Sequence, residues 1–452
     1  MNAGANVRTM KTAAEQALAD TFAGAQPRLP GKGAVAAMRA EAFRRFEAAG
    51  LPHRRVEAWK YTDLRALMRE ANPLAPPPDA DAKTTASRGL STSLLAGVDC
   101  RRIVFVNGCF VPELSDLDKL EPGLRIRSMA QAMAEGDPLI EKYLGKVVDI
   151  DDAALALNTA LMGDGALVHI GEGAVVERPI LLIRCVVSAS PVAVFPRSLI
   201  VAERKARATV ISGSHVETKG EGGSVAHQSN AATELVIGDG AEIDYLRLTT
   251  GAAEGHSVTT MLASLGANAR FDTFNFTNGG AVVRNQMFVR LDGEGTKAGL
   301  RGVNLLRGRQ HADTTLVVDH AKGHCESREL FKTALYGESR GVFQGKIVVR
   351  PHAQKTDGKM TSNALLLSED AEMDNKPELE IFADDVVCGH GATAGAIDED
   401  LKFYLLSRGI PPKEAEALLI QAFVGEALEA IVHEDIRNAL MASTVAWLEA
   451  RS

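Results

Sequence analysis

The feature that most constrains the fold is a loose repeat between about residues 155 and 395, where helix signals are scarce. Short alternating strands are joined by tight turns of small or acidic residues, as in "VIGDGAEIDYLRL", "SLGANARFDTFNF" and "LYGESRGVFQGKIVV". The turns recur every 25 to 45 residues or so, and long arrays of this kind indicate solenoids or propellers. Neither a GH…WD pattern nor a strict hexapeptide period is present. We therefore expect a parallel β-helix with aliphatic side chains stacked inside it.

The region before the repeat has mixed signals. "GAVAAMRAEAFRRFEAAG" carries apolar residues at helical spacing and predicts a helix that Gly50 ends. "RRIVFVNGCFVPEL" predicts a β-hairpin that turns at Asn107 and Gly108. Residues 1–150 are therefore predicted to form an N-terminal region of mixed helical and α/β structure.

The sequence after the repeat predicts helices. Asp398 is a suitable N-cap for a first helix that Gly409 ends. A second helix is predicted from Lys413 to about Val432 and a third to about Ala450. The predicted fold is thus mainly β: a β-helix core over 151–396 lies between the N-terminal region and an α-helical domain over 397–452.

Composition excludes several classes of protein. The net charge is −8, and without a basic run the chain is a poor partner for nucleic acid. No stretch approaches the 18–20 or so apolar residues of a membrane span, and the first residues lack the apolar core of a secretory signal. The cysteines are scattered without a CxxC pair, which argues against a disulfide framework or a zinc ribbon. A reducing, cytoplasmic location is predicted.

One short segment combines a thiol with an imidazole. Residues 383–393 read "ADDVVCGHGAT", and on a strand Cys388 and His390 would project from the same face. Such a pair suits a soft metal such as iron or zinc, and it also suits a Cys/His nucleophile. A packed thiol beside a histidine bonded to the backbone explains the same residues.

A second polar cluster lies in "GRQHADTTLVVDHAKGHCESREL" and comprises His311, Asp313, His320, His324 and Cys325. Together they could bind a transition metal, although the spacing lacks the pattern of HExxH or paired CxxC sites. A polar solenoid edge or a dimer surface is an equally good explanation.

Catalytic motifs are absent from the sequence. There is no GxSxG elbow, no P-loop and no GxGxxG that follows a strand. A carbohydrate-active β-helix would need acids and bases on one face, and the chain offers such candidates in one segment: Lys346, Arg350, His352, Lys355 and Asp357.

Several long blocks resemble the SufB/SufD family of the SUF iron–sulfur cluster assembly machinery. They are "LLRGRQHADTTLVVDHAKGHCESRELFK", "GVFQGKIVVRPHAQKTDGKMTSNALLLSEDAEMDNKPELEIFADDVVCGHGAT", "FYLLSRGIP" and, nearer the start, "RRVEAWKYTDL" and "VFVNGCFVPELS". The resemblance implies a right-handed parallel β-helix with a helical C-terminal domain and no catalytic residues. It further implies that the chain pairs with a SufB-like subunit and binds a SufC-like ABC-type ATPase. An iron–sulfur cluster would be held transiently between the subunits, with none stably bound by the isolated chain.

Two differences from SufB-like proteins make this chain resemble the SufD branch of the family more closely. Gly391 stands in "HGAT" where SufB-like proteins have glutamate, and Thr361, Ser362 and Asn363 stand where those proteins carry a cysteine. The resemblance makes His390 a cluster or iron ligand, with Cys388 as an auxiliary ligand or a packed thiol. Gly389 stands between Cys388 and His390 where many members of the resembled family have serine, and this difference leaves both candidate ligands in place.

The resemblance also gives the terminal helices a partner, since "FYLLSRGIP" places Phe403, Tyr404, Arg408 and Gly409 near the expected ATPase contact. Simple capping of the solenoid is the alternative. Without its partner the chain is expected to form a homodimer through the same β-helix edge. Two other functions are alternatives: an iron-supply protein that binds iron or reduced flavin, and a β-helix carbohydrate-active enzyme.

Overall fold

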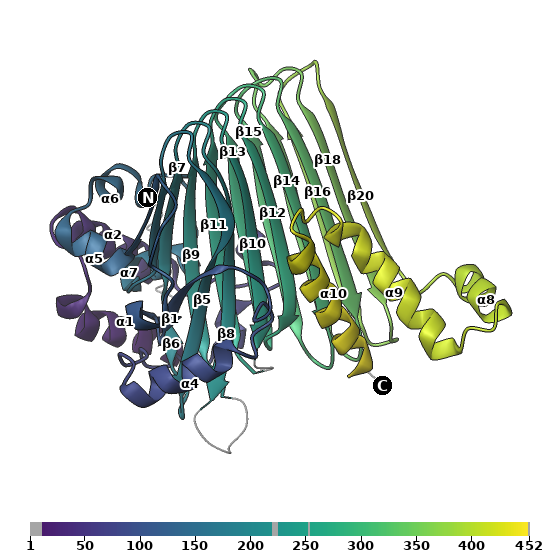
Figure 1. Ribbon diagram of the computed structural model, residues 1–452, viewed down its shortest axis with the longest axis horizontal. Coiled ribbons are helices and arrows are strands. Elements are labelled where there is room, and N and C mark those ends of the chain that lie inside the picture. Colours follow the sequence, from purple (N-terminus) through teal and green to yellow (C-terminus); the bar gives the residue numbers. More distant parts are fainter. Residues whose placement is uncertain (1–10, 219–224, 252–253, 451–452) are drawn as a thin grey trace, which may run out of the picture.

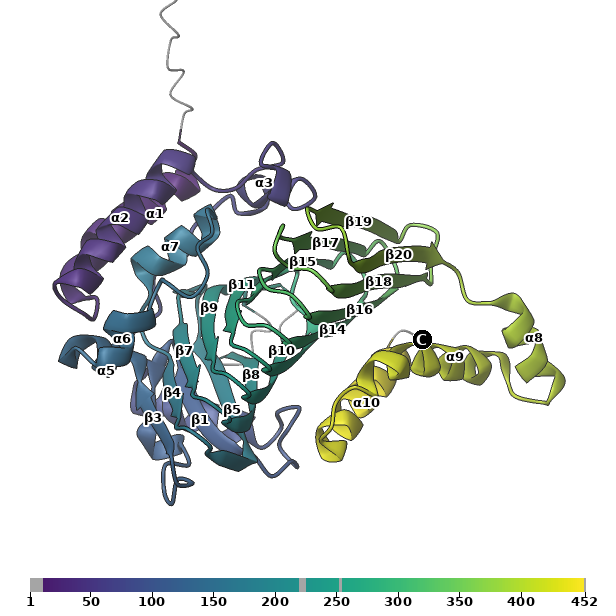
Figure 2. The same cartoon turned by 90° about the horizontal axis from the view of Figure 1, so that it is seen from above.

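The computed structural model describes residues 11–218, 225–251 and 254–450. Part of the N-terminal segment judged to lack a secretory signal, and the outer limits of the first and last predicted domains, lie outside these residues. The fold is mainly β, as predicted: helices from the N-terminal and C-terminal regions pack against a parallel β-solenoid (Figure 1). Each coil contributes one strand to each of two facing sheets (Figure 2).

Sheet 1 contains the odd-numbered strands from β7 onward, together with β3, β4 and β6. Its members, in order across the sheet, are β19 (Glu372–Ile381), β17 (Arg340–Val349), β15 (His311–His320), β13 (Val282–Leu291), β11 (His256–Leu265), β9 (Gln228–Ile237), β7 (Arg197–Ala202), β4 (Ala166–Ile170) and β3 (Leu124–Ser128), with β6 (Ala193–Val194) beside β9. All pairs are parallel except β3 with β4.

Sheet 2 contains the even-numbered strands from β8 onward, together with β1, β2 and β5. In order, they are β2 (Cys109–Phe110), β1 (Arg101–Val106), β5 (Val175–Ser188), β8 (Arg207–Thr218), β10 (Glu242–Gly251), β12 (Arg270–Gly279), β14 (Lys297–Leu306), β16 (Glu326–Leu335), β18 (Asp357–Leu366) and β20 (Val387–Gly395). The β1–β2 hairpin turns at Asn107 and Gly108, both with positive φ, as predicted. Since β1 pairs with β5, the N-terminal region extends the solenoid sheet.

The two strands of each strand–turn–strand unit belong to opposite sheets, so the turns are corners and not hairpins. β9 and β10, for example, pair with β11 and β12 and not with each other. One coil takes roughly 30 residues, as in other repeat proteins. One corner position repeatedly adopts the left-handed backbone conformation; it is occupied by Gly173, Lys205, Gly240, Asn268, Gly295, His324 and Lys355. Each of these seven residues donates a backbone hydrogen bond to the next coil, so the corners stack in register.

The solenoid interior is an apolar core. Residues from both sheets alternate inward and pack together, among them Leu235, Met261 and Leu316 of sheet 1 and Val210 and Met360 of sheet 2. This is the expected stack of aliphatic side chains, because every second residue of a strand faces the same side.

Helices cover the outer faces of both sheets. The N-terminal region contributes α1 (Ala13–Ala25), α2 (Ala34–Ala49), α3 (Leu64–Leu67), α4 (Ala80–Leu90), α5 (Met129–Glu135), α6 (Pro138–Tyr143) and α7 (Ala153–Leu161). Gly50 ends α2 with a positive φ, as predicted. Helix α7 packs on β9 of sheet 1 (Figure 2), whereas α4 packs on β5 and β8 of sheet 2.

The C-terminal residues form α8 (Glu399–Ser407), α9 (Pro412–Leu428) and α10 (Glu434–Glu449). Asp398 caps α8 by accepting hydrogen bonds from two backbone N–H groups, and Gly409 follows the helix with a φ of 84°. Helix α9 packs on β14 and β16. Among the described residues, no helix is both long enough and apolar enough to cross a membrane.

Candidate functional site at the open end of the solenoid

The last coil leaves one end of the solenoid open. Among the strands that the structure describes, β19 pairs only with β17, and β20 pairs only with β18. The residues of both strands are exposed or partly exposed, in contrast to the buried strands of the preceding coils. The end of the interior core is therefore accessible there.

β20 places Cys388 and His390 at this open end. In the register with β18, Cys388 lies opposite Gly358 and His390 opposite Met360. Met360 is buried in the interior core, and Cys388 packs against the same core. Both side chains therefore lie on the inward face of β20, with His390 exposed because no further coil covers it.

The environment of Cys388 favours the neutral thiol. Burial raises its pKa, and the negative charges of Asp357 and Glu329 raise it further, while a hydrogen bond from the Gly358 backbone opposes the shift. Because metals bind the thiolate, coordination at this position would release a proton.

A buried carboxyl group, Glu329, lies close to this site and was missed in the sequence. In sheet 2 its position stacks on Met360, and Met360 stacks on His390. The side chain is 2% exposed, and neither carboxyl oxygen has a hydrogen-bond partner in the described structure. Burial raises the pKa of Glu329 to about 8, although the Ser327 hydroxyl opposes the shift. In "ESRELFKTAL", Ser327, Glu329 and Phe331 occupy every second position, so the sequence could have placed Glu329 on the inward face of the strand.

The five members of the second polar cluster do not come together. His320 and Cys325 lie inside the solenoid: His320 Nε2 is 3.0 Å from the Ser327 hydroxyl, and the Cys325 thiol donates to the Gly293 carbonyl at 3.2 Å. Burial lowers the pKa of His320 to about 4 and raises the pKa of Cys325. His324 is an exposed corner residue with a φ of 57°.

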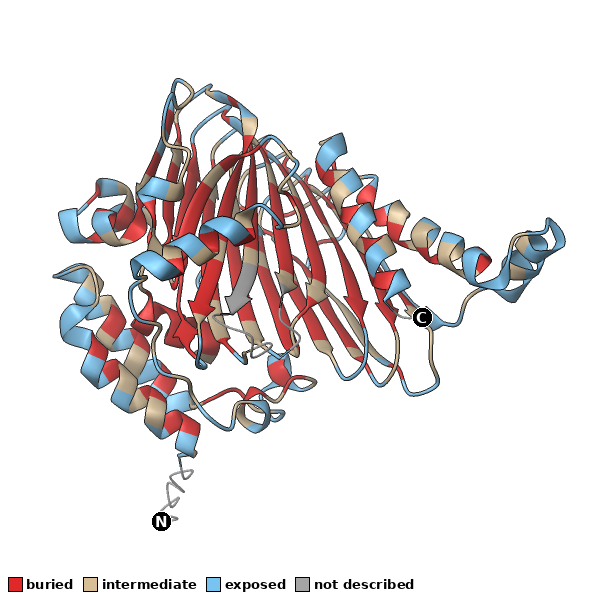
Figure 3. Cartoon of the chain, turned by 60° about the horizontal axis from the view of Figure 1, so that its bottom comes forward, coloured by how far each residue is buried: buried red, intermediate tan, exposed pale blue. Residues whose placement is uncertain are grey.

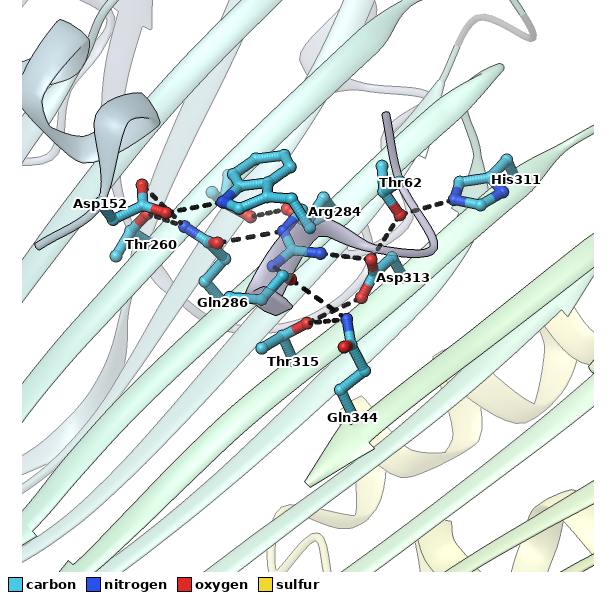
Figure 4. Close-up of polar contacts among 12 residues, drawn as sticks. Thr62, Asp152, Thr260, Arg284, Gln286, His311, Asp313, Thr315 and Gln344 are labelled. Atoms are coloured by element: carbon cyan, nitrogen blue, oxygen red, sulfur yellow. Dashed lines mark hydrogen bonds and ion pairs between the residues drawn. The ribbon is translucent and has the colours of Figure 1, made fainter. Parts of the chain in front are cut away.

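His311 and Asp313 lie on the outer face of sheet 1 and contact the N-terminal region (Figure 4). The Thr62 hydroxyl donates to Asp313 and is 2.9 Å from His311 Nε2. Asp313 also forms an ion pair with Arg284, and both side chains are fully buried. The Trp59 ring stacks on the Arg284 guanidinium at 3.9 Å. These contacts attach the Trp59 segment to the solenoid.

The basic and acidic residues weighed for a carbohydrate-active site form separate ion pairs. Lys346 pairs with Glu380, Arg350 with Asp319, Lys355 with Asp385, and Asp357 with Arg328, while His352 is exposed. Within the parts of the chain that the structure describes, no three His, Cys, Asp or Glu side chains are grouped to hold a metal ion. Cys388 and His390 thus remain a two-residue site.

Helix α8 projects from the solenoid and has no buried residue (Figure 3). Phe403 is 72% exposed and Tyr404 54% exposed. The Arg408 guanidinium lies over the Tyr404 ring at 5.1 Å, next to Gly409. All four residues of the predicted ATPase contact are therefore near one another on an exposed helix end.

Comparison with known proteins covers almost the whole chain. Residues 185–423 match the model of the SUF system FeS cluster assembly SufBD core domain, and residues 13–182 match that of the SufBD protein N-terminal region. The chain is 32% identical to the iron–sulfur cluster assembly protein SufD of Escherichia coli, over 87% of this chain and 88% of that protein. It is 31% identical to an iron–sulfur cluster assembly SufBD family protein of Synechocystis, over 84% of each chain. SufD of Bacillus subtilis is 29% identical over 71% of this chain and 73% of its own length. The chain belongs to the SufBD family of iron–sulfur cluster assembly proteins.

Proposed function

We propose that this protein is a SufD-like scaffold without turnover of its own. It pairs with a SufB-like subunit through the open end of the solenoid and binds a SufC-like ATPase through its C-terminal helices. His390 is a ligand of the cluster that assembles between the two subunits. The cluster is the cargo of this complex and leaves it after assembly.

The observation that carries the proposal is the unprotected edge of β20. Its sequence, "VCGHGATAG", contains no charged residue and no proline. Exposed edge strands of monomers are usually protected by lysine, proline or a covering segment, because their free N–H and C=O groups invite pairing. The edge of sheet 1 has such protection, since β19 contains Lys376 and Pro377. β20 therefore suits addition of a strand from a partner.

The glycines of β20 support a close approach by that partner. A Cβ atom built on Gly389, Gly391 or Gly395 would meet nothing within 4 Å, and none has a positive φ. These residues are thus not required by the packing or the backbone of the isolated chain. Small residues here would let a second backbone or a cluster approach β20 closely.

His390 and Cys388 supply the ligand types found in iron–sulfur proteins, where histidine can replace thiolates. Two protein ligands from this chain leave further coordination positions for a partner. An exposed imidazole beside a protonated thiol is a weaker site than four thiolates, which suits a cluster that must be passed on.

The proposed ATPase surface is the exposed end of α8. Phe403 and Tyr404 offer aromatic area, and aromatic residues and arginine are enriched where proteins bind one another. An unpartnered helix with an apolar face suits docking into a groove of the ATPase.

The first test is anaerobic co-expression with the SufB-like and SufC-like proteins of the same host. We expect His390→Ala to form the three-component complex but to lose most of the visible cluster absorption per complex. His352→Ala is the matched control, because that histidine is also exposed but lies outside the site. An unchanged spectrum in His390→Ala would remove this residue from cluster binding, whereas failure of the wild type to form a complex would contradict the proposed function itself.

A second test concerns the edge of β20. Ala392 is exposed in the middle of the strand, and Ala392→Lys adds the kind of charge that blocks edge pairing. We expect at least tenfold weaker binding of the SufB-like subunit and loss of any homodimer of the isolated chain, with an unchanged melting temperature. Binding is measured by titration and the mass by light scattering. Ala392→Ser is the control, and equal binding by both variants would place the interface elsewhere.

A further inference from the structure

A cavity of about 70 Å³ lies far from the open end, at the first coils of the solenoid. Arg184 of β5 and Arg247 of β10 reach it from sheet 2, and His227 borders it just before β9 of sheet 1. Arg184 stands in register with Ser214 and Thr249, which also line the cavity. Hydrogen-bond donors from both sheets therefore line the cavity.

Arg247 is a buried cation for which the described residues supply no carboxylate partner. It is 6% exposed, and its Nε and Nη1 atoms have no hydrogen-bond partner in the described structure. None of the described residues around the cavity is aspartate or glutamate. The other buried arginines of the solenoid sheets have carboxylate partners, as in the pairs Arg197–Glu234 and Arg284–Asp313.

Arg184 places a second positive charge beside the first. Burial and the charge of Arg247 together lower the pKa of Arg184 to about 10. At neutral pH the Arg184 guanidinium is nevertheless charged, since this value lies far above 7. Two adjacent cations, Arg247 buried and Arg184 partly buried, are unfavourable unless an anion compensates them.

His227 adds a neutral donor to the same wall. Its Nδ1 atom accepts a hydrogen bond from the Val192 backbone N–H at 3.3 Å, so a neutral ring carries its proton on Nε2. That Nε2 atom is buried and has no partner among the described residues. Burial lowers the pKa of His227, which keeps the ring neutral at pH 7.

We propose that this cavity binds a small inorganic oxyanion of the phosphate or sulfate type. Oxyanions accept charge-assisted hydrogen bonds from guanidinium groups, and two arginines with one histidine N–H match several oxygens at once. The volume is several times the 10–15 Å³ or so that one water requires, so a tetrahedral anion can be accommodated. This site is independent of the partner surfaces, because β20 and α8 contribute no residue to it.

The proposal can be tested on the full chain after exhaustive dialysis into phosphate-free buffer. Phosphate binding is measured by calorimetry, and the melting temperature is followed with phosphate or with sodium chloride at equal ionic strength. We expect saturable binding to the wild type and a rise in melting temperature that chloride does not reproduce, because a ligand of the native state stabilises it.

Arg247→Met is expected to bind phosphate at least tenfold more weakly. Without phosphate it is expected to melt at a higher temperature than the wild type, because one of two uncompensated charges is gone. Arg309→Met is the control, since Arg309 is an exposed arginine of the same solenoid. Arg184→Met provides a second variant if Arg247→Met does not fold. Absence of phosphate binding in the wild type, or unchanged affinity in a folded cavity variant, would overturn the proposal.

Discussion

Asp313→Ala is expected to lower the free energy of unfolding by about 3–5 kcal/mol, because it leaves a buried charge without its partner. Arg284 is fully buried between Asp313, the Trp59 ring and the Ala58 carbonyl, which accepts a hydrogen bond from Arg284 at 2.6 Å. None of the other groups can neutralise the guanidinium. Denaturant unfolding of the isolated chain measures the loss. Limited proteolysis should show earlier cleavage around Trp59, which this network attaches to sheet 1.

Asp319→Ala is the matched control on the same strand. Asp319 also pairs with an arginine, and Arg350 donates to both of its oxygens at 2.8 and 3.0 Å. Half of the Arg350 side chain is exposed, however, so its charge stays solvated when the carboxylate is removed. A loss of no more than about 1 kcal/mol is expected. Equal losses in the two variants would show that burial does not set the strength of the Arg284–Asp313 pair.

The sequence predicted those features of the fold that depend on residues close together in the chain. Alternating strands joined by tight turns of small or acidic residues predicted a parallel β-helix, because inward positions and left-handed turns recur along the solenoid. Local signals also located the β1–β2 turn at Asn107 and Gly108. They located the start of α8 at Asp398 and its end near Gly409. Local signals do not show which strands pair, and the assignment of successive strands to opposite sheets comes from the structure.

The site was less predictable because it depends on contacts between distant coils. Alternation alone put Cys388 and His390 on one face, but the open end follows from β20 being the last strand. His311 and Asp313 looked like metal ligands because their partners Thr62 and Arg284 lie far away in the chain. The cavity arginines are on strands that only the register of sheet 2 brings together.

Glu329→Gln is expected to make the protein more stable at pH 8 and to have little effect near pH 4.5. Burial raises the pKa of Glu329 to about 8, so the folded protein holds this proton in a range where the unfolded chain has released it. Stability therefore falls as the pH rises from the ordinary glutamate value of 4.5 towards 8. The slope is about 1.4 kcal/mol per pH unit for one such group. Glutamine has the same shape and does not titrate, so the variant should lack this slope.

The dependence of wild-type stability on pH would not show the effect of Glu329 at lower pH by itself, because His320 changes the stability in the opposite direction there. Burial lowers its pKa to about 4, so the unfolded chain binds the extra proton up to the ordinary value of 6.5, and stability rises with pH over that window. Unfolding of wild type and Glu329→Gln should therefore be compared at each pH from 4.5 to 8. Glu326→Gln is the control, since Glu326 lies on the same strand but is partly exposed and paired with Arg328. A difference between wild type and Glu329→Gln that stays constant with pH would mean that this carboxyl is ionised inside the solenoid. The charge beside Cys388 would then be permanent.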